Sequence, residues 1–233
     1  MARKKKITKK KLKEPDEFIS LSEKAYRFIV QYHKPIVTGG IVLLVVVLVI
    51  ILFQKWEKRK EADAEQKFAV AIQLYQGIIS PNREESPSEY KNVSEKFDEV
   101  IAKFPRTSAG KLSLLYKGNI HLQLGEFGEA IKKYQTFLQK AGKVKLYHLL
   151  AVEGMGYAYE EMKDYEKALQ AYQKILEMGK NFETADAYLN MGRCYEKLGK
   201  NKEALENYQA FIKISEKSPV ANAVLRKISI LEK

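Results

Sequence analysis

The sequence offers few side chains for catalysis or metal binding. Among its 233 residues are one Cys, at position 194, and three His, at positions 33, 121 and 148. A single Cys excludes an intrachain disulfide and a Cys₄ or Cys₂His₂ metal site. No GxGxxG, GxxxxGK[ST], GxSxG or HExxH motif occurs. We therefore predict that the protein is not an enzyme and requires no cofactor or metal.

The isolated Cys and His residues fit structural roles better than chemical ones. Cys194 falls at a helical packing position with no His nearby in the pattern, so we interpret it as a small buried residue and not as a nucleophile. We interpret His121 as a core substitution and His148 as a surface residue. The function must then lie in a binding surface, and the charge distribution gives the first indication of its partners.

The net charge of +12 comes from 41 Lys and Arg against 29 Asp and Glu. An excess of this size suggests an anionic partner, either nucleic acid or a lipid surface. Residues 1–34 contribute +7 and residues 54–60 contribute +3, whereas residues 61–233 contribute only +2. The positive charge therefore flanks one uncharged segment, and a nearly neutral region follows.

The uncharged segment Ile36–Phe53 is predicted to form a transmembrane helix over residues 35–56. Its 18 residues span about 27 Å as a helix, which is enough for a bilayer core. Tyr32 and Trp56 would lie at the two interfaces. A buried soluble helix or strand is one alternative. A cleaved signal peptide is another, but the A-x-A sequence at 62–64 lies nine residues beyond the apolar run.

The flanking charges predict the topology. The tail at 1–34 is more basic than the downstream flank, so the positive-inside rule favours a cytoplasmic N-terminus. The C-terminal domain would then face the periplasm of a bacterium from the inner membrane. Within the tail, residues 16–32 have the apolar spacing of a short amphipathic helix. We expect the Lys/Arg run at 1–13 to contact anionic lipid, with a ribosome or nucleic-acid tether as an alternative.

The region after the membrane segment contains an internal repeat. Segments 114–138, 152–176 and 188–212 align with spacings of 38 and 36 residues. Each segment predicts two antiparallel helices, with small residues where the helices cross closely and apolar residues on the packed faces. Such units must stack on one another to bury those faces. The aligned residues are Gly118, Gly156 and Gly192, then Ala130, Ala168 and Ala204, then Tyr134, Tyr172 and Tyr208.

This Gly–Ala–Tyr pattern resembles the tetratricopeptide repeat. The resemblance implies an all-α fold: a single N-terminal transmembrane helix followed by an α-solenoid with a C-terminal capping helix. We expect a linker helix and degenerate first repeat at 57–110, three repeats at 111–217 and the capping helix at 218–233. His121 and Asn201 depart from the aromatic residues found at the equivalent positions of the other units.

The resemblance also implies a protein-binding groove on the concave face of the solenoid. Carried over position by position, its lining would mix apolar side chains with acids and suit extended or helical segments that are apolar and basic. The implied residues are Leu112, Leu115, Asn119, Leu122, Leu150, Glu153, Tyr157, Glu160, Asp186, Leu189, Arg193 and Glu196.

As a whole, the chain resembles the bacterial family of membrane-anchored tetratricopeptide proteins typified by the ancillary subunit of the Sec translocon. The resemblance implies a scaffold or chaperone-like adaptor whose partners are translocon subunits, periplasmic chaperones or exported proteins, with no small-molecule substrate. An envelope-assembly or cell-division scaffold is the alternative that the same architecture allows.

Overall fold

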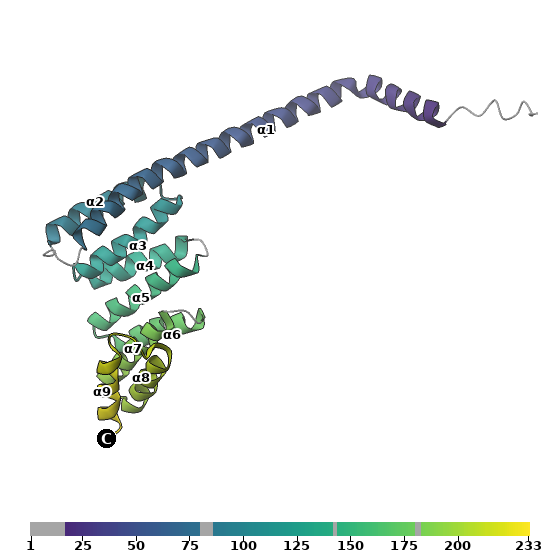
Figure 1. The fold of residues 1–233 in the computed structure, drawn as a ribbon. Coiled ribbons are helices and arrows are strands. Elements are labelled where there is room, and N and C mark those ends of the chain that lie inside the picture. Colours follow the sequence, from purple (N-terminus) through teal and green to yellow (C-terminus); the bar gives the residue numbers. More distant parts are fainter. Residues whose placement is uncertain (1–16, 80–85, 142–143, 180–182) are drawn as a thin grey trace, which may run out of the picture. The chain divides into compact units, whose positions relative to one another are not determined.

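The computed structural model describes residues 17–79, 86–141, 144–179 and 183–233, and all regular secondary structure within these ranges is α-helical. The chain divides into two compact units, one ending at Lys58 and one comprising Arg59–Lys233. Figure 1 labels the helices. The Lys/Arg run at 1–13 lies outside the described residues.

The first unit contains most of helix α1, which runs from Glu17 to Ile78. The backbone leaves the helical conformation at Tyr32 (φ −109°, ψ 16°), three residues before Pro35. Because Pro lacks an N–H and its ring crowds the carbonyl four residues earlier, a kink at this point is expected. Of residues 16–32, the segment with amphipathic spacing, those from Glu17 onward form the part of α1 before this kink, and residue 16 lies outside the described residues.

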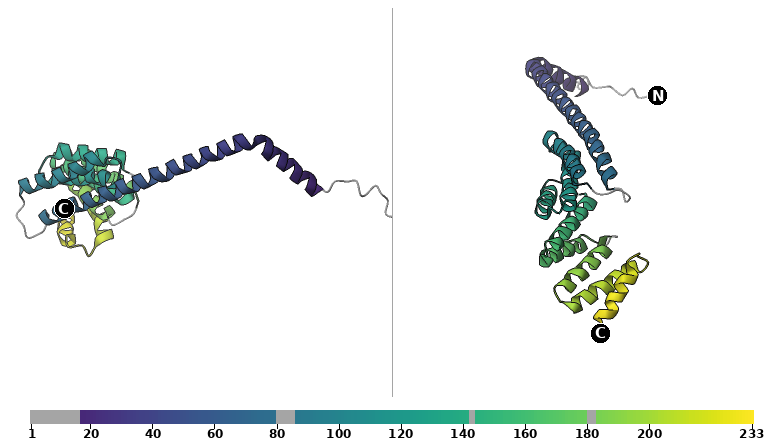
Figure 2. Two further views of the ribbon diagram at one scale, coloured as in Figure 1. Left: turned by 90° about the horizontal axis from the view of Figure 1, so that it is seen from above. Right: turned by 90° about the vertical axis from the view of Figure 1, so that its left-hand side faces the viewer.

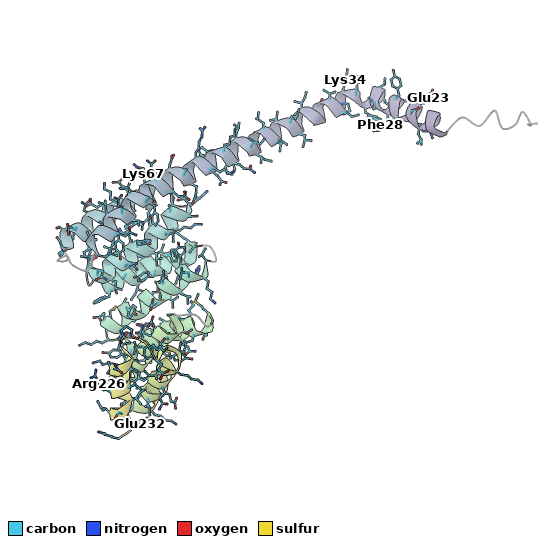
Figure 3. The ribbon with its side chains drawn as sticks, in the orientation of Figure 1. Glu23, Phe28, Lys34, Lys67, Arg226 and Glu232 are labelled. Atoms are coloured by element: carbon cyan, nitrogen blue, oxygen red, sulfur yellow. The ribbon has the colours of Figure 1, made fainter. Side chains whose placement is uncertain are left out.

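Helix α1 is long and apolar enough to cross a membrane. Its most apolar 18-residue window has a mean hydropathy of 3.3, and none of that window is buried within the described chain. Phe28, which is 58% exposed, projects outward from the helix in Figure 3. A core helix of a soluble protein would be mostly buried, whereas a signal sequence would share these properties.

The second unit is a stack of antiparallel helix pairs, visible in the right-hand view of Figure 2. The last part of α1 packs with α2 and α3 through Tyr75, Phe97 and Ile120. The helices that follow are α2 (Pro87–Lys103), α3 (Ser108–Gln123), α4 (Phe127–Lys140), α5 (Lys145–Glu161), α6 (Tyr165–Glu177), α7 (Glu183–Lys197), α8 (Asn201–Ser215) and α9 (Ala221–Leu231).

The three repeats correspond to the pairs α3–α4, α5–α6 and α7–α8. Their turns contain Gly125, Lys163 and Gly199, each with a positive φ of 61–73° that reverses the chain after the first helix. Helix α9 packs on α8 through Val224 and covers the last pair. The predicted α-solenoid with a C-terminal capping helix is confirmed.

The repeated Gly and Tyr residues form one packing unit within each pair. A Cβ built on Gly118 would lie 2.4 Å from Cε1 of Tyr134, and a Cβ on Gly156 would lie 2.4 Å from Cε1 of Tyr172. Gly192 and Tyr208 repeat the arrangement at 2.5 Å. The Gly is therefore required because the Tyr ring of the second helix lies directly on the backbone of the first.

Candidate functional site: the face formed by α3, α5 and α7

The first helices of the three repeats contribute to a common face. Helices α3 and α5 contact each other, as do α5 and α7, in addition to each helix packing on its own partner. This arrangement brings the residues expected in the groove onto successive helices of one surface. Their exposure and bonding differ from repeat to repeat.

On α3 the expected groove residues mainly pack against other residues. Leu115 is buried, and Leu112 and Leu122 contact the same apolar cluster. Oδ1 of Asn119 accepts a hydrogen bond from the Tyr134 hydroxyl at 2.8 Å. This end of the face therefore offers few polar groups for binding a partner.

On α5 and α7 a carboxylate links two repeats. Glu160 accepts two hydrogen bonds from Arg193, from Nε to Oε1 and from Nη2 to Oε2, both at 3.0 Å. The buried Tyr172 hydroxyl donates to the same Oε2 at 3.0 Å. Because Glu160 lies in the second repeat and Arg193 in the third, this pair stabilises the joint between them.

Glu196 makes the equivalent link between the last repeat and the capping helix. Its Oε2 accepts hydrogen bonds from the Tyr208 hydroxyl and from Nζ of Lys227 on α9, both at 2.6 Å. Although burial opposes ionisation, the bonds from Lys227 and Tyr208 lower the pKa of Glu196 overall. Lys227, which sequence analysis did not select, also lies 5.7 Å from the centre of the Tyr208 ring.

The middle of the face carries a polar group around Tyr157. This half-buried side chain packs edge-on against Tyr172, and its hydroxyl donates a long hydrogen bond of 3.4 Å to Oε1 of Glu153. Burial and then the charge of Glu153 raise the pKa of Tyr157, with a smaller contribution from Asp186. Leu150 is 39% exposed one helical turn from Glu153, and Asp186 is also exposed.

Asn190 is the residue of this group that the sequence analysis missed. Its side chain is only 2% exposed, and it approaches Tyr157 and lowers the pKa of that hydroxyl. Within the described part of the chain, its Nδ2 makes no hydrogen bond of ordinary geometry. In the repeat alignment, Asn190 occupies the position of Tyr116 and Gly154 in the other two units. Its amide differs from both of those residues, and this difference was the signal in the sequence.

The charge of the face follows from these pairs. Glu160 and Glu196 pair with Arg193 and Lys227, and Glu153 and Asp186 place further negative charge close to Tyr157. Leu189 is half-buried and packs against the last apolar cluster. The central part of the face is therefore acidic and contains one buried amide donor.

Cys194 is fully buried between α5, α6 and α7. Burial, with a smaller contribution from Glu160, raises the pKa of its thiol to about 12. At pH 8 only about one thiol in 10⁴ would then be ionised.

We expect iodoacetamide to alkylate Cys194 at least about 100-fold more slowly in the folded chain than in urea. Equal rates, measured by mass spectrometry, would contradict its assignment as a packing residue.

The arrangement of paired helices defines an α-solenoid, a class whose members generally act as non-enzymatic scaffolds for other proteins. Residues 146–217 match the family described as the tetratricopeptide repeat. The match covers the second and third of the three repeats that the sequence pattern predicted, which are the pairs α5–α6 and α7–α8. Comparison with curated proteins gives no match.

Three solved structures have a similar fold. A tetratricopeptide repeat protein from Parabacteroides merdae ATCC 43184 is 21% identical with a TM-score of 0.56, over 72% of this chain and 60% of that protein. The MamA protein is 18% identical with a TM-score of 0.55, over 72% of this chain and 81% of that protein. MamA 41-end from Desulfovibrio magneticus RS-1 is 18% identical with a TM-score of 0.53, over 70% of this chain and 82% of that protein. This chain thus spans less than two thirds of the Parabacteroides protein, and the likeness shows the fold alone.

Proposed function

We propose that this protein is a membrane-anchored scaffold whose face on α3, α5 and α7 binds extended segments of other proteins. The observation that carries the proposal is the group around Tyr157, which combines exposed Leu150 on α5 and exposed Asp186 on α7 with the half-buried Tyr157 and Glu153. A helical segment already uses its backbone N–H and carbonyl groups internally, whereas an extended one offers them to polar side chains of this kind.

The charge of the same region indicates the side chains of the occupant. Glu153 and Asp186 both lie close enough to Tyr157 to shift its pKa, and Leu150 is exposed on the same helix as Glu153. An extended segment with a Lys or Arg facing these acids and an apolar residue facing Leu150 would complement the face. Exported and membrane-inserting chains are rich in such segments before they fold.

The location is the second part of the proposal. The apolar helix α1, together with the basic residues on both sides of it, supports a single-pass protein of the bacterial inner membrane. We place the N-terminus in the cytoplasm, with its Lys/Arg tail on anionic lipid, and the repeats in the periplasm. The partners would then be translocon subunits, periplasmic chaperones or exported proteins, and the protein would act as a chaperone-like adaptor.

Photo-crosslinking in living cells tests this function. A photoreactive residue replacing Leu150 should form adducts with translocon subunits or newly exported chains, identified by mass spectrometry. The matched control replaces Gln173, which is exposed on the second helix α6. Adducts dominated by division or wall-synthesis proteins would contradict the translocon role and favour an envelope-assembly scaffold. Equal adducts from both positions would contradict the use of this face.

A further inference from the structure

A cavity of about 540 Å³ lies at the ends of helices, within the Arg59–Lys233 unit. It is lined by Pro105 and Arg106 in the α2–α3 turn, Lys111 in the first turn of α3 and Lys140 in the last turn of α4. Figure 1 shows these three helices side by side. The lining includes none of the twelve residues expected in the groove, so this is a separate site.

The cavity gathers cations from three elements, and none of the described residues that line it is an acid. No carboxylate is among the residues that line it, and no ion pair of Arg106, Lys111 or Lys140 occurs in the described part of the chain. Glu61 reaches the neighbouring turn, but its Oε1 accepts the backbone N–H of Ser108 at 2.8 Å. In sequence, residues 103–111 and 139–146 together contain six Lys and Arg and no Asp or Glu.

Cations grouped in this way repel one another unless an anion joins them. Lys111 is half-buried, so water screens its charge less than that of a fully exposed residue. A carboxylate supplies one negative charge and two oxygens. The phosphoryl group of a phosphate monoester carries a charge of about −1.5 to −2 and three strong acceptor oxygens, one for each cation. The Arg106 guanidinium can also bind two of those oxygens at once.

We propose that Arg106, Lys111 and Lys140 form a binding site for a phosphoryl-group anion. Two sources supply this chemistry: a soluble phosphate compound and a lipid whose headgroup is a phosphate monoester, such as phosphatidic acid. The site goes beyond the scaffold function, because it neither uses nor requires the face on α3, α5 and α7. It would give the repeat unit a second contact whose affinity decreases as the salt concentration rises.

Lysine footprinting of the full-length chain tests the site. The protein is placed in phosphatidylcholine nanodiscs and treated with an acetylating reagent, and the modification of each Lys is followed by mass spectrometry. One arm adds sodium pyrophosphate and the other adds vesicles containing phosphatidic acid. Lys200 and Lys202, at the start of α8, serve as exposed internal controls.

We expect acetylation of both Lys111 and Lys140 to slow at least threefold in one of the two arms, which identifies the source, while the controls change little. Arg106→Gln should remove most of this protection, whereas Lys163→Gln, which removes one charge at the α5–α6 turn, should retain it. No protection in either arm would overturn the proposal. Equal protection of Lys200 and Lys202, or protection that survives Arg106→Gln, would also overturn it.

Discussion

Replacing Gly156 by Ala should lower the free energy of unfolding by about 2 kcal/mol, because the new Cβ would overlap a ring that cannot move. It would lie within 2.9 Å of three ring atoms of Tyr172. That ring is fully buried, and its hydroxyl is held by Glu160. The overlap must also exceed the gain of about 1 kcal/mol that Ala normally brings to a helix interior.

Gly128→Ala is the matched control for this substitution. Gly128 lies in α4, and a Cβ built there meets nothing within 4 Å. This variant should therefore be as stable as the original chain or more stable by up to about 1 kcal/mol. Urea titration of the full-length chain in detergent, followed by far-UV circular dichroism, measures both. A stable Gly156→Ala variant would show that the Gly–Tyr contact does not hold the repeat together.

Removing the Glu160 carboxylate should cost a similar amount. Glu160→Ala leaves the buried Tyr172 hydroxyl without its acceptor and leaves Arg193 without its partner across the repeat joint. Breaking a fully buried pair costs about 3–5 kcal/mol, but the Arg193 side chain is 38% exposed, so we expect about 2 kcal/mol. The loss appears as a lower midpoint in the same urea titration.

A double-mutant cycle separates the ion pair from the rest of this effect. Combining Glu160→Ala with Arg193→Ala should give a coupling energy of about 1 kcal/mol or more. The exposed pair Glu129–Lys132, at 2.6 Å on α4, is the control and should give about 0.3 kcal/mol. Equal coupling in the two cycles would contradict the view that Glu160 and Arg193 join two repeats.

The repeated helix pairs could be predicted from sequence because their packing is periodic. The Gly, Ala and Tyr residues recur at fixed spacing, and each Gly–Tyr contact forms within a single repeat. The turn glycines Gly125 and Gly199 also have the positive φ that a chain reversal requires. Local spacing therefore carries enough information for the fold.

The bonding within the candidate site could not be predicted in the same way. Glu160 and Arg193 are 33 residues apart, and Glu196 and Lys227 are 31 apart, in different repeats or in the capping helix. The repeat pattern places such residues on one face but does not specify which side chains pair. For this reason the sequence suggested four acids in the lining of the groove but did not indicate that Glu160 and Glu196 pair with Arg193 and Lys227.

Asn190 shows a second kind of limit. A single amide in one repeat leaves no periodic signal, and its importance follows from burial and bonding that only the folded chain reveals. The kink at Tyr32 was easier to anticipate, since Pro35 is visible in the sequence. The burial and the neighbours of each polar group cannot be read from the sequence alone.

The central claim is that the face on α3, α5 and α7 binds extended segments that carry apolar and basic residues. The most direct measurement compares two fluorescent extended peptides that are identical except for Lys or Glu at the charged positions, titrated with the full-length chain in detergent and followed by anisotropy. We expect the Lys peptide to bind at least about tenfold more tightly, which corresponds to about 1.4 kcal/mol. Combining Glu153→Gln with Asp186→Asn should abolish the preference. Equal binding of the two peptides, or a preference that survives both substitutions, would contradict the account.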